Sequence, residues 1–301
     1  MKPLLKDNGE PFTEVLEYDG YLFPNMLGCQ QDIDVAEYLA SIDELGFEGD
    51  EMCIVSYPRS GTHWTYEICN MIKTGRSDFT DTLMPMLEYS PREHLKTAQA
   101  TNRIYSSHMY PKHMPKQFMA KRCKIIQVYR NPKDVAVSLF NFSKKVTHQY
   151  STGDMGFSEY LRHYRSGNVL CRSWAQWIQE WNIFKKENPD YPLLQIAYED
   201  MKKDLKESVQ RISDFLCLNS TPQLIEDIAD KCEFNVMAAH KNSNIPQNME
   251  LITDIKNTHV FYGKGGVGEW KNHFTVAENE AFDKDMETIL PELSLNITYE
   301  L

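Results

Sequence analysis

The chain has 301 residues, of which 42% are hydrophobic and 25% are charged. This globular composition excludes disordered, collagen-like and coiled-coil proteins. The formal net charge of −11 argues against general nucleic-acid binding, which needs a basic face. An anionic ligand must therefore be held by a local group of basic residues.

The cysteines and the apolar segments bear on the cellular compartment. Seven cysteines are scattered along the chain without a CxxC pair, which argues against a disulfide framework or a zinc site and fits a reducing compartment. Residues 1–12 lack the apolar core of a signal peptide, and no stretch approaches the ~18 apolar residues of a membrane span. We therefore expect a cytoplasmic protein with no membrane partner.

Short β-branched runs alternate with helical patterns along the chain. The predicted strands cover residues 52–57, 103–107, 123–129 and 193–198. The predicted helices cover residues 64–73, 132–145, 169–186 and 205–216. This alternation predicts a single α/β domain, residues 1–301, with a central parallel sheet flanked by helices. Ligands of such sheets bind beyond the carboxyl ends of the strands, so the residues after each strand are candidates for the site.

The first predicted strand leads through the loop PRSGTHW, residues 58–64, into a helix. Gly61 permits a ligand to approach the backbone, and the free N–H groups and dipole of the helix N-terminus attract an anion. Arg59 adds a positive charge to this P-loop-like strand–loop–helix unit, although the GxxxxGK[ST] spacing of a true P-loop is absent. A turn capped by Ser60 or Thr62 is an equally good interpretation of this segment alone.

Further candidates follow the other strands. Arg130 follows the third strand, where a guanidinium can hold a phosphate with two hydrogen bonds or pair with a nearby carboxylate. His108 follows the second strand and is a candidate general base, because an imidazole titrates near neutrality, or else a structural histidine. The glycine-rich segment GKGGVG, residues 263–268, either covers a phosphate or forms a flexible surface loop.

Taken together, these segments resemble the cytosolic sulfotransferase family, whose sulfuryl donor is 3′-phosphoadenosine 5′-phosphosulfate (PAPS). Residues 57–64, YPRSGTHW, are similar to the family's 5′-phosphosulfate loop YPKSGTTW, and residues 129–138, YRNPKDVAVS, are similar to its 3′-phosphate segment. The YED at 198–200, the CEFNVM at 232–237 and the KGGVGEWKN at 264–272 resemble the family's YED, TSFxxM and RKGxxGDWKN. The resemblance covers nearly the whole chain.

The resemblance assigns roles to individual residues. The 5′-phosphosulfate would be held by Arg59, Ser60, Gly61, Thr62, His63 and Trp64. The 3′-phosphate would be held by Arg130, Ser138, Gly263, Lys264 and Gly265. The purine would be framed by Trp64, Tyr198, Cys232, Phe234 and Met237. His108 corresponds to the family's catalytic histidine.

The implied reaction transfers a sulfuryl group to a hydroxyl or amine of a small apolar or phenolic acceptor. His108 would take the acceptor's proton, while Arg59 and the helix N-terminus would stabilise the charge on the leaving phosphate. Metal is not required, and the sequence contains no recognisable cluster of metal ligands. The acceptor-binding residues expected are Phe23, Ser106 and Phe142, although such aromatic residues could equally belong to the core.

Three positions depart from the family pattern. Arg59 replaces a lysine, Ser106 stands where a lysine is frequent, and Gly263 replaces the arginine of RKG. These departures keep open an alternative, namely a catalytically weak or inactive relative that binds nucleotide or small molecules. A nucleotide kinase is disfavoured because the Walker lysine and a Mg²⁺-binding pattern are missing. A short C-terminal pattern resembles the one through which many members form homodimers, and its residues are Lys271, Thr275, Val276 and Glu280.

Overall fold

The computed structural model of the protein describes residues 1–28, 30–31, 33–146, 151–244 and 263–301. The strands are β1 (Lys2–Leu5), β2 (Pro11–Tyr18), β3 (Tyr21–Pro24), β4 (Met26–Leu27), β5 (Gln30–Gln31), β6 (Met52–Ser56), β7 (Ile104–Ser107), β8 (Lys124–Tyr129) and β9 (Leu193–Ala197). The helices are α1 (Val35–Asp43), α2 (Thr62–Thr74), α3 (Arg92–Ala100), α4 (Lys116–Ala120), α5 (Pro132–Ser143), α6 (Phe157–Ser166), α7 (Trp174–Glu187), α8 (Tyr198–Lys203), α9 (Leu205–Leu216), α10 (Pro222–Lys231), α11 (Phe234–Ser243) and α12 (Val276–Met286).

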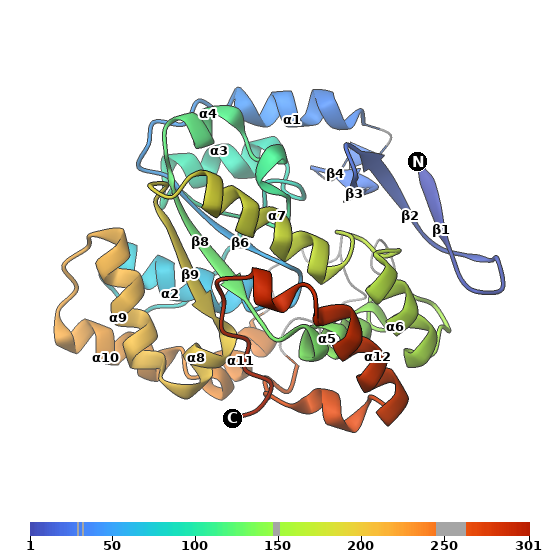
Figure 1. Ribbon diagram of the computed structural model, residues 1–301. Coiled ribbons are helices and arrows are strands. Elements are labelled where there is room, and N and C mark those ends of the chain that lie inside the picture. The colour runs from blue at the N-terminus through green and yellow to red at the C-terminus, as the bar shows by residue number, and fades with distance from the viewer. Residues whose placement is uncertain (29, 32, 147–150, 245–262) are drawn as a thin grey trace.

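The central sheet consists of four parallel strands in the order β7-β6-β8-β9 (Figure 1). Each lies within one residue of a predicted strand at both ends, so the predicted α/β fold with a central parallel sheet flanked by helices is confirmed. The chain leaves β6 toward β7 on one side, whereas β8 lies on the other side of β6. Such a reversal opens a crevice at the carboxyl ends of the two neighbouring strands.

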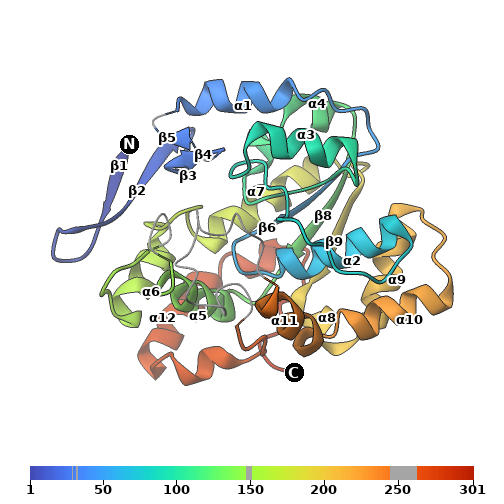
Figure 2. The same ribbon diagram turned by 180° about the vertical axis from the view of Figure 1, so that it is seen from behind.

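Both faces of the sheet are apolar because helices cover both of them. In β6, Cys53 and Val55 belong to the core cluster that contains Trp177 of α7. Met52 and Ile54 alternate with them and belong to the cluster that contains apolar side chains of α2. Accordingly, α7 crosses the sheet toward the viewer in Figure 1, and α2 lies toward the viewer in Figure 2.

Helix α7 begins five residues later than the predicted start at position 169. Ser173 accepts a hydrogen bond from the backbone N–H of Gln176, and the Gln176 side chain accepts one from the backbone N–H of Ser173. This capping box starts the helix at Trp174. Cys171 and Arg172 precede it with φ angles of 67° and 63°, which a right-handed helix excludes. The predicted tryptophan face is buried, and its members are Trp174, Trp177 and Trp181.

The N-terminal strands β1, β2 and β3 form an antiparallel sheet that the sequence analysis missed. Asp19 and Gly20, with φ angles of 45° and 77°, connect β2 to β3, and Tyr18 pairs with Tyr21 across the turn. Positive φ angles at both central residues are those of a type I′ turn, for which Asp-Gly is a favoured sequence. The Asp19–Gly20 dipeptide between two apolar runs is the sequence signal that could have predicted this hairpin.

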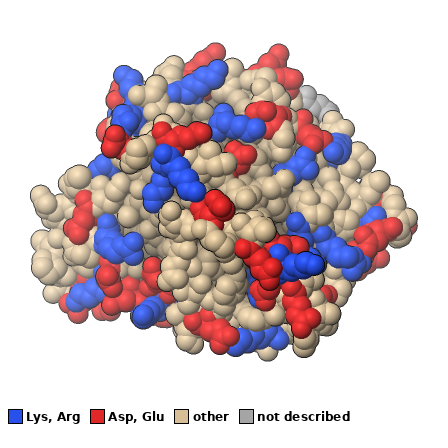
Figure 3. Space-filling view, viewed as in Figure 1, with Lys and Arg blue, Asp and Glu red and all other residues tan. Residues whose placement is uncertain are grey.

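Acidic and basic side chains intermingle on one face of the molecule. Over the face shown in Figure 3, Lys and Arg alternate with Asp and Glu, so this face is not the uniformly basic surface that binds nucleic acid. Among the described residues, no helix has the length and apolar character needed to cross a membrane.

Candidate active site

A cavity of about 580 Å³ opens at the carboxyl ends of the central strands. Arg59, His108 and Arg130, which follow β6, β7 and β8, all line it. The crevice therefore lies where the strand order predicts. The other predicted site residues that line it are Gly61, Thr62, His63, Trp64, Ser138, Phe142, Tyr198, Phe234, Met237, Gly263, Lys264 and Gly265.

The loop after β6 leaves the N-terminus of α2 open. Gly61 is the N-cap of α2 at φ 109° and has no side chain, so the first N–H groups of the helix receive no hydrogen bond from the N-cap residue. Thr62 and His63 in this first turn line the cavity. Thr62 is not a cap, because its hydroxyl contacts that of Ser56 at 2.6 Å. The buried hydroxyl of Ser60 has no hydrogen-bond partner among the described residues. The alternative of an ordinary capped turn therefore does not hold, and the arrangement suits an anion.

Arg59 extends from this loop toward α5. Its backbone is left-handed, with φ 70°. Its Nε donates to the Ser138 hydroxyl at 3.3 Å, and its guanidinium lies 4.8 Å from the centre of the Phe142 ring. Arg59 thus brings a positive charge to the wall shared by the two predicted anion-binding segments.

Arg130 donates to two backbone carbonyls rather than to a carboxylate. Nη1 donates to the Arg59 carbonyl at 3.2 Å, and Nη2 donates to the Gly266 carbonyl at 2.9 Å. The guanidinium stacks 4.2 Å from the centre of the Tyr198 ring. Its buried Nε has no hydrogen-bond partner among the described residues. A buried donor of this kind suits an anionic ligand.

The His108 ring is held in one tautomer. Nδ1 lies 2.7 Å from the Ser56 carbonyl, which can only accept a hydrogen bond, so Nδ1 carries the proton in the neutral ring and Nε2 is the basic atom. Burial, together with the weaker effect of the Arg59 charge, lowers the pKa of His108 to about 4 against the opposing effect of the hydrogen bond to Ser56. The ring is therefore neutral near pH 7 and can accept a proton.

Three side chains that the sequence analysis did not assign hold the backbone of His108. Glu88 accepts a hydrogen bond from its N–H at 2.6 Å. Tyr21 and Trp177 donate to its carbonyl at 2.8 Å and 2.6 Å. Burial raises the pKa of Glu88 to about 7. These partners come from β3, α7 and the segment before α3. Because these segments are far apart in the sequence, no local sequence pattern could have linked them to His108.

Aromatic rings line one end of the cavity. The indole N–H of Trp64 donates to the Cys232 carbonyl at 2.7 Å, and its ring lies edge-on to Tyr198 and Phe234 at 5.4 Å and 5.9 Å. The Cys232 side chain itself is buried against Met71 and does not line the cavity. Cys232 therefore supports the position of Trp64 rather than facing a ligand.

The glycine-rich segment is anchored over the site at both sides. The Asp134 carboxylate on α5 accepts hydrogen bonds from the N–H groups of Gly268 and Trp270 at 2.8 Å and 2.9 Å, and Tyr198 donates to the Gly265 carbonyl at 3.0 Å. Gly265 is left-handed, with φ 64°, and a Cβ there would lie 2.1 Å from the Phe234 ring. Glycine is therefore required at this position.

Gly263 is in a different situation. A Cβ built at Gly263 would meet nothing within 4 Å, and its backbone is not left-handed. Lys264, whose side chain is 76% exposed, pairs with Glu269. Because Gly263 lines the cavity, a longer side chain there has room.

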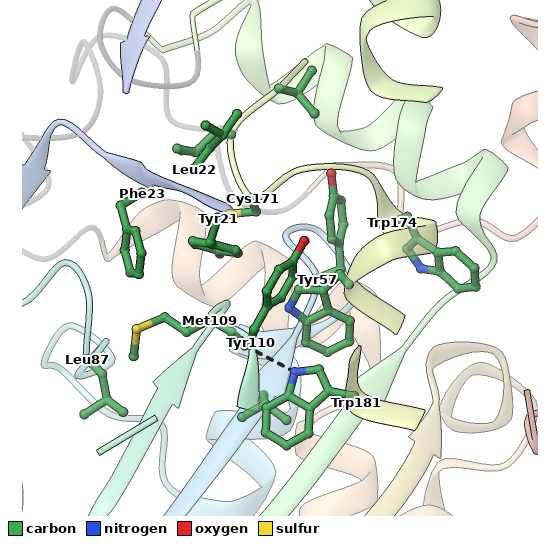
Figure 4. Close-up of a cluster of buried hydrophobic side chains, with 14 of the residues drawn as sticks. Tyr21, Leu22, Phe23, Tyr57, Leu87, Met109, Tyr110, Cys171, Trp174 and Trp181 are labelled. Atoms are coloured by element: carbon green, nitrogen blue, oxygen red, sulfur yellow. Dashed lines mark hydrogen bonds between the residues drawn. The ribbon is translucent and has the colours of Figure 1, made fainter. Parts of the chain in front are cut away.

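Two of the expected acceptor-binding residues lie in the core. Phe23 is fully buried and belongs to the hydrophobic cluster drawn in Figure 4. The centre of its ring lies 4.7 Å from that of Tyr21, with the two rings edge-on. Ser106 is also fully buried, because its position on β7 directs its hydroxyl to the Pro85 carbonyl at 3.0 Å. Neither lines the cavity, so both assignments are corrected, whereas Phe142 does line it.

The residues of the expected dimerisation pattern lie at the surface. Lys271 pairs with Glu300 at 2.6 Å, and Thr275 caps α12. Val276 is 76% exposed, and Glu280 is also exposed.

Comparisons with known proteins identify the family. The sulfotransferase domain model matches residues 49–294. The chain is 31% identical to the amine sulfotransferase of Oryctolagus cuniculus, over 92% of this chain and 93% of that protein. It is 32% identical to sulfotransferase 1E1 of Homo sapiens, over 93% and 97% of the two chains.

Solved structures of the sulfotransferase fold also match this chain. The crystal structure of mouse sulfotransferase SULT7A1 complexed with PAP matches with a TM-score of 0.73 and 28% identity, over 92% of this chain and 95% of that chain. Retinol dehydratase in a complex with retinol and PAP shares the fold, with a TM-score of 0.70 and 19% identity over 88% of each chain. The chain therefore belongs to the sulfotransferase family and is a sulfotransferase, as its motifs predict.

Proposed function

We propose that this protein is a cytoplasmic, PAPS-dependent sulfotransferase that acts on a hydroxyl or amine of a small apolar or phenolic acceptor, with His108 as the general base. The observation that carries the proposal is the hydrogen bond from His108 Nδ1 to the Ser56 carbonyl, 2.7 Å long, in a ring that lines the cavity. It leaves Nε2 as the basic atom of a ring that lines the same cavity as the uncapped N-terminus of α2.

The residues present fit a nucleotide with phosphate groups at two positions. The uncapped N-terminus of α2, the Ser60 hydroxyl and Arg59 would hold the 5′-phosphosulfate. Arg130, with its unsatisfied buried Nε, and Ser138 would hold the 3′-phosphate. The rings of Trp64, Tyr198 and Phe234 would surround the purine.

PAPS, when bound, supplies the sulfuryl group. His108 Nε2 would remove the proton from the acceptor, and the ring would keep its orientation through Ser56. Arg59 and the N–H groups of α2 would stabilise the negative charge left on the donor phosphate. This chemistry consists of positioning and charge neutralisation.

Five apolar side chains also line the cavity, which supports an apolar or phenolic acceptor. They are Met84, Met86, Tyr89, Val137 and Phe142. A flat ring would pack among them and bring its hydroxyl toward His108.

Sulfuryl transfer from PAPS to a panel of a phenol, a steroid alcohol and an aryl amine tests the proposal. We expect one equivalent of sulfated acceptor for each PAP (3′-phosphoadenosine 5′-phosphate) released. Binding of PAP without transfer to any acceptor would favour the alternative, an inactive nucleotide-binding relative. Turnover of ATP with Mg²⁺ would contradict both.

Substitution of Gly263 tests the departure from the RKG pattern. We expect Gly263→Arg to tighten PAP binding modestly, because a charge-assisted contact worth ~1–3 kcal/mol is opposed by up to ~2 kcal/mol of side-chain ordering. Gly263→Ala should be neutral, since its backbone is not left-handed and its Cβ has space. Calorimetry at two salt concentrations measures both, and the arginine's gain should shrink at high salt. Equal damage from both substitutions would contradict the lost-contact explanation.

The low pKa of His108 predicts an unusual pH profile. Burial lowers this pKa to about 4, so the base is protonated and lost only as the pH falls through that value. At pH 5.5 an ordinary histidine with a pKa near 6.5 would keep only about a tenth of its basic form. We expect kcat/KM at pH 5.5 to exceed half of its maximum, with circular dichroism as the control for folding. An acid limb near pH 6.5 would contradict the assignment.

Homodimerisation through Lys271, Thr275, Val276 and Glu280 remains part of the proposal. The 76% exposure of Val276 supports it, because an apolar side chain at the surface gains from burial. Sedimentation of Val276→Glu against the parent chain tests it, and an unchanged mass would contradict it.

A further inference from the structure

Three possible metal ligands from two distant segments of the chain meet outside the cavity. Asp7 follows β1, and Glu159 and His163 lie on α6. One ligand atom from each lies within 4.8 Å of the others. None of the three lines the cavity. Glu159 and His163 are four residues apart, which places them on the same face of the helix.

His163 is the feature that points to a ligand. The residue is 8% exposed, and its buried Nε2 has no hydrogen-bond partner among the described residues. This atom faces Asp7 Oδ1 at 3.4 Å, beyond the usual length of a hydrogen bond. Two ligands at ~2.0–2.1 Å from a tetrahedral Zn²⁺ are separated by roughly 3.3 Å, so the spacing of the His163–Asp7 pair suits a shared ion.

The neighbouring contacts orient these groups. The Asp7 backbone N–H donates to Glu159 at 2.8 Å, which holds that carboxylate beside Asp7. Arg162 donates a hydrogen bond to Asp7 Oδ2, which leaves Oδ1 to face His163. His163 Nδ1 lies 2.8 Å from the Asn168 amide. Since an amide offers either a donor or an acceptor, rotation of Asn168 keeps this contact when Nδ1 carries the proton and Nε2 binds metal.

We propose that Asp7, Glu159 and His163 form a Zn²⁺ site with its remaining position open to water. An imidazole nitrogen with two carboxylates suits zinc, whereas Mg²⁺ and Ca²⁺ prefer oxygen ligands alone. The ion would fasten the turn between β1 and β2 to α6. The site is structural and independent of sulfuryl transfer.

Titration of the full chain with Zn²⁺ tests the site. The background is Cys217→Ser, because Cys217 is the exposed free cysteine among those described and its thiol also binds zinc. We expect one equivalent to bind and to raise the melting temperature, since the ion binds only the folded state. Asp7→Asn and Glu159→Gln, which preserve shape, should each weaken binding at least about tenfold. Glu187→Gln, at the exposed end of α7, is the matched control and should bind zinc like the parent.

The melting temperature of Asp7→Asn without metal shows whether this variant is still folded. Asp7 is exposed, so Asp7→Asn should melt like the parent in EDTA. The proposal is overturned if the parent shows no one-equivalent binding, if the two isosteric variants bind zinc as the parent does, or if Mg²⁺ competes at equal concentration.

Discussion

His108→Ala is expected to lower kcat by roughly 10²–10⁴-fold, the usual contribution of a general base. The ring lines the cavity, and its hydrogen bond to the Ser56 carbonyl leaves Nε2 basic. Alanine removes this base and leaves the loop after β6 in place. Single-turnover sulfation at saturating PAPS measures the effect.

Binding of PAP is the control for this variant. Because the donor contacts proposed for Arg130 and Ser138 do not involve His108, the Kd for PAP should change by less than about threefold. His108→Gln keeps a polar side chain of similar size and should also be slow. A variant that retains more than about a tenth of the parent rate would exclude His108 as the base.

Arg130→Ala is expected to weaken PAP binding by ~1.5–3 kcal/mol, roughly 10- to 150-fold, because a buried phosphate loses charge-assisted hydrogen bonds. Arg130 also joins the loop after β6 to the glycine-rich segment through the carbonyls of Arg59 and Gly266. Part of the loss is therefore structural and is shared by every nucleotide ligand.

The analogue of PAP that lacks the 3′-phosphate separates the two effects. In calorimetry, Arg130→Ala should weaken PAP far more than this analogue, and Arg130→Lys should fall between, since lysine keeps the charge without the planar fork. Arg122→Ala is the matched control, because Arg122 stacks on Tyr191 and does not line the cavity. Equal losses for both ligands would mean that Arg130 does not bind the 3′-phosphate.

Local patterns were enough to predict the central sheet and the residues at its carboxyl edge. Buried parallel strands appear in the sequence as short β-branched runs. The ends of these runs therefore predict where β6, β7 and β8 end. The start of α7 was missed because its periodic face extends upstream, and the Ser173–Gln176 capping box decides the boundary.

The rest of the site depends on contacts between distant segments. No sequence pattern indicates that Glu88 and Trp177 hold the backbone of His108, or that Asp134 anchors the glycine-rich segment. Phe23 and Ser106 were misplaced for the same reason, since an aromatic ring or a hydroxyl beside a strand end can face either the core or the cavity. The grouping of Asp7 with α6 is likewise a product of tertiary structure.

The N-terminal hairpin lies outside the matched family domain but supports the candidate active site. The described residues that line the cavity all lie within the matched range 49–294. Tyr21, which follows the Asp19–Gly20 turn, nevertheless donates one of the two hydrogen bonds on the His108 carbonyl. A chain trimmed to the matched range would keep these lining residues and would lose the hydrogen bond from Tyr21 that supports the backbone of His108. A truncation designed for expression must therefore begin before the hairpin.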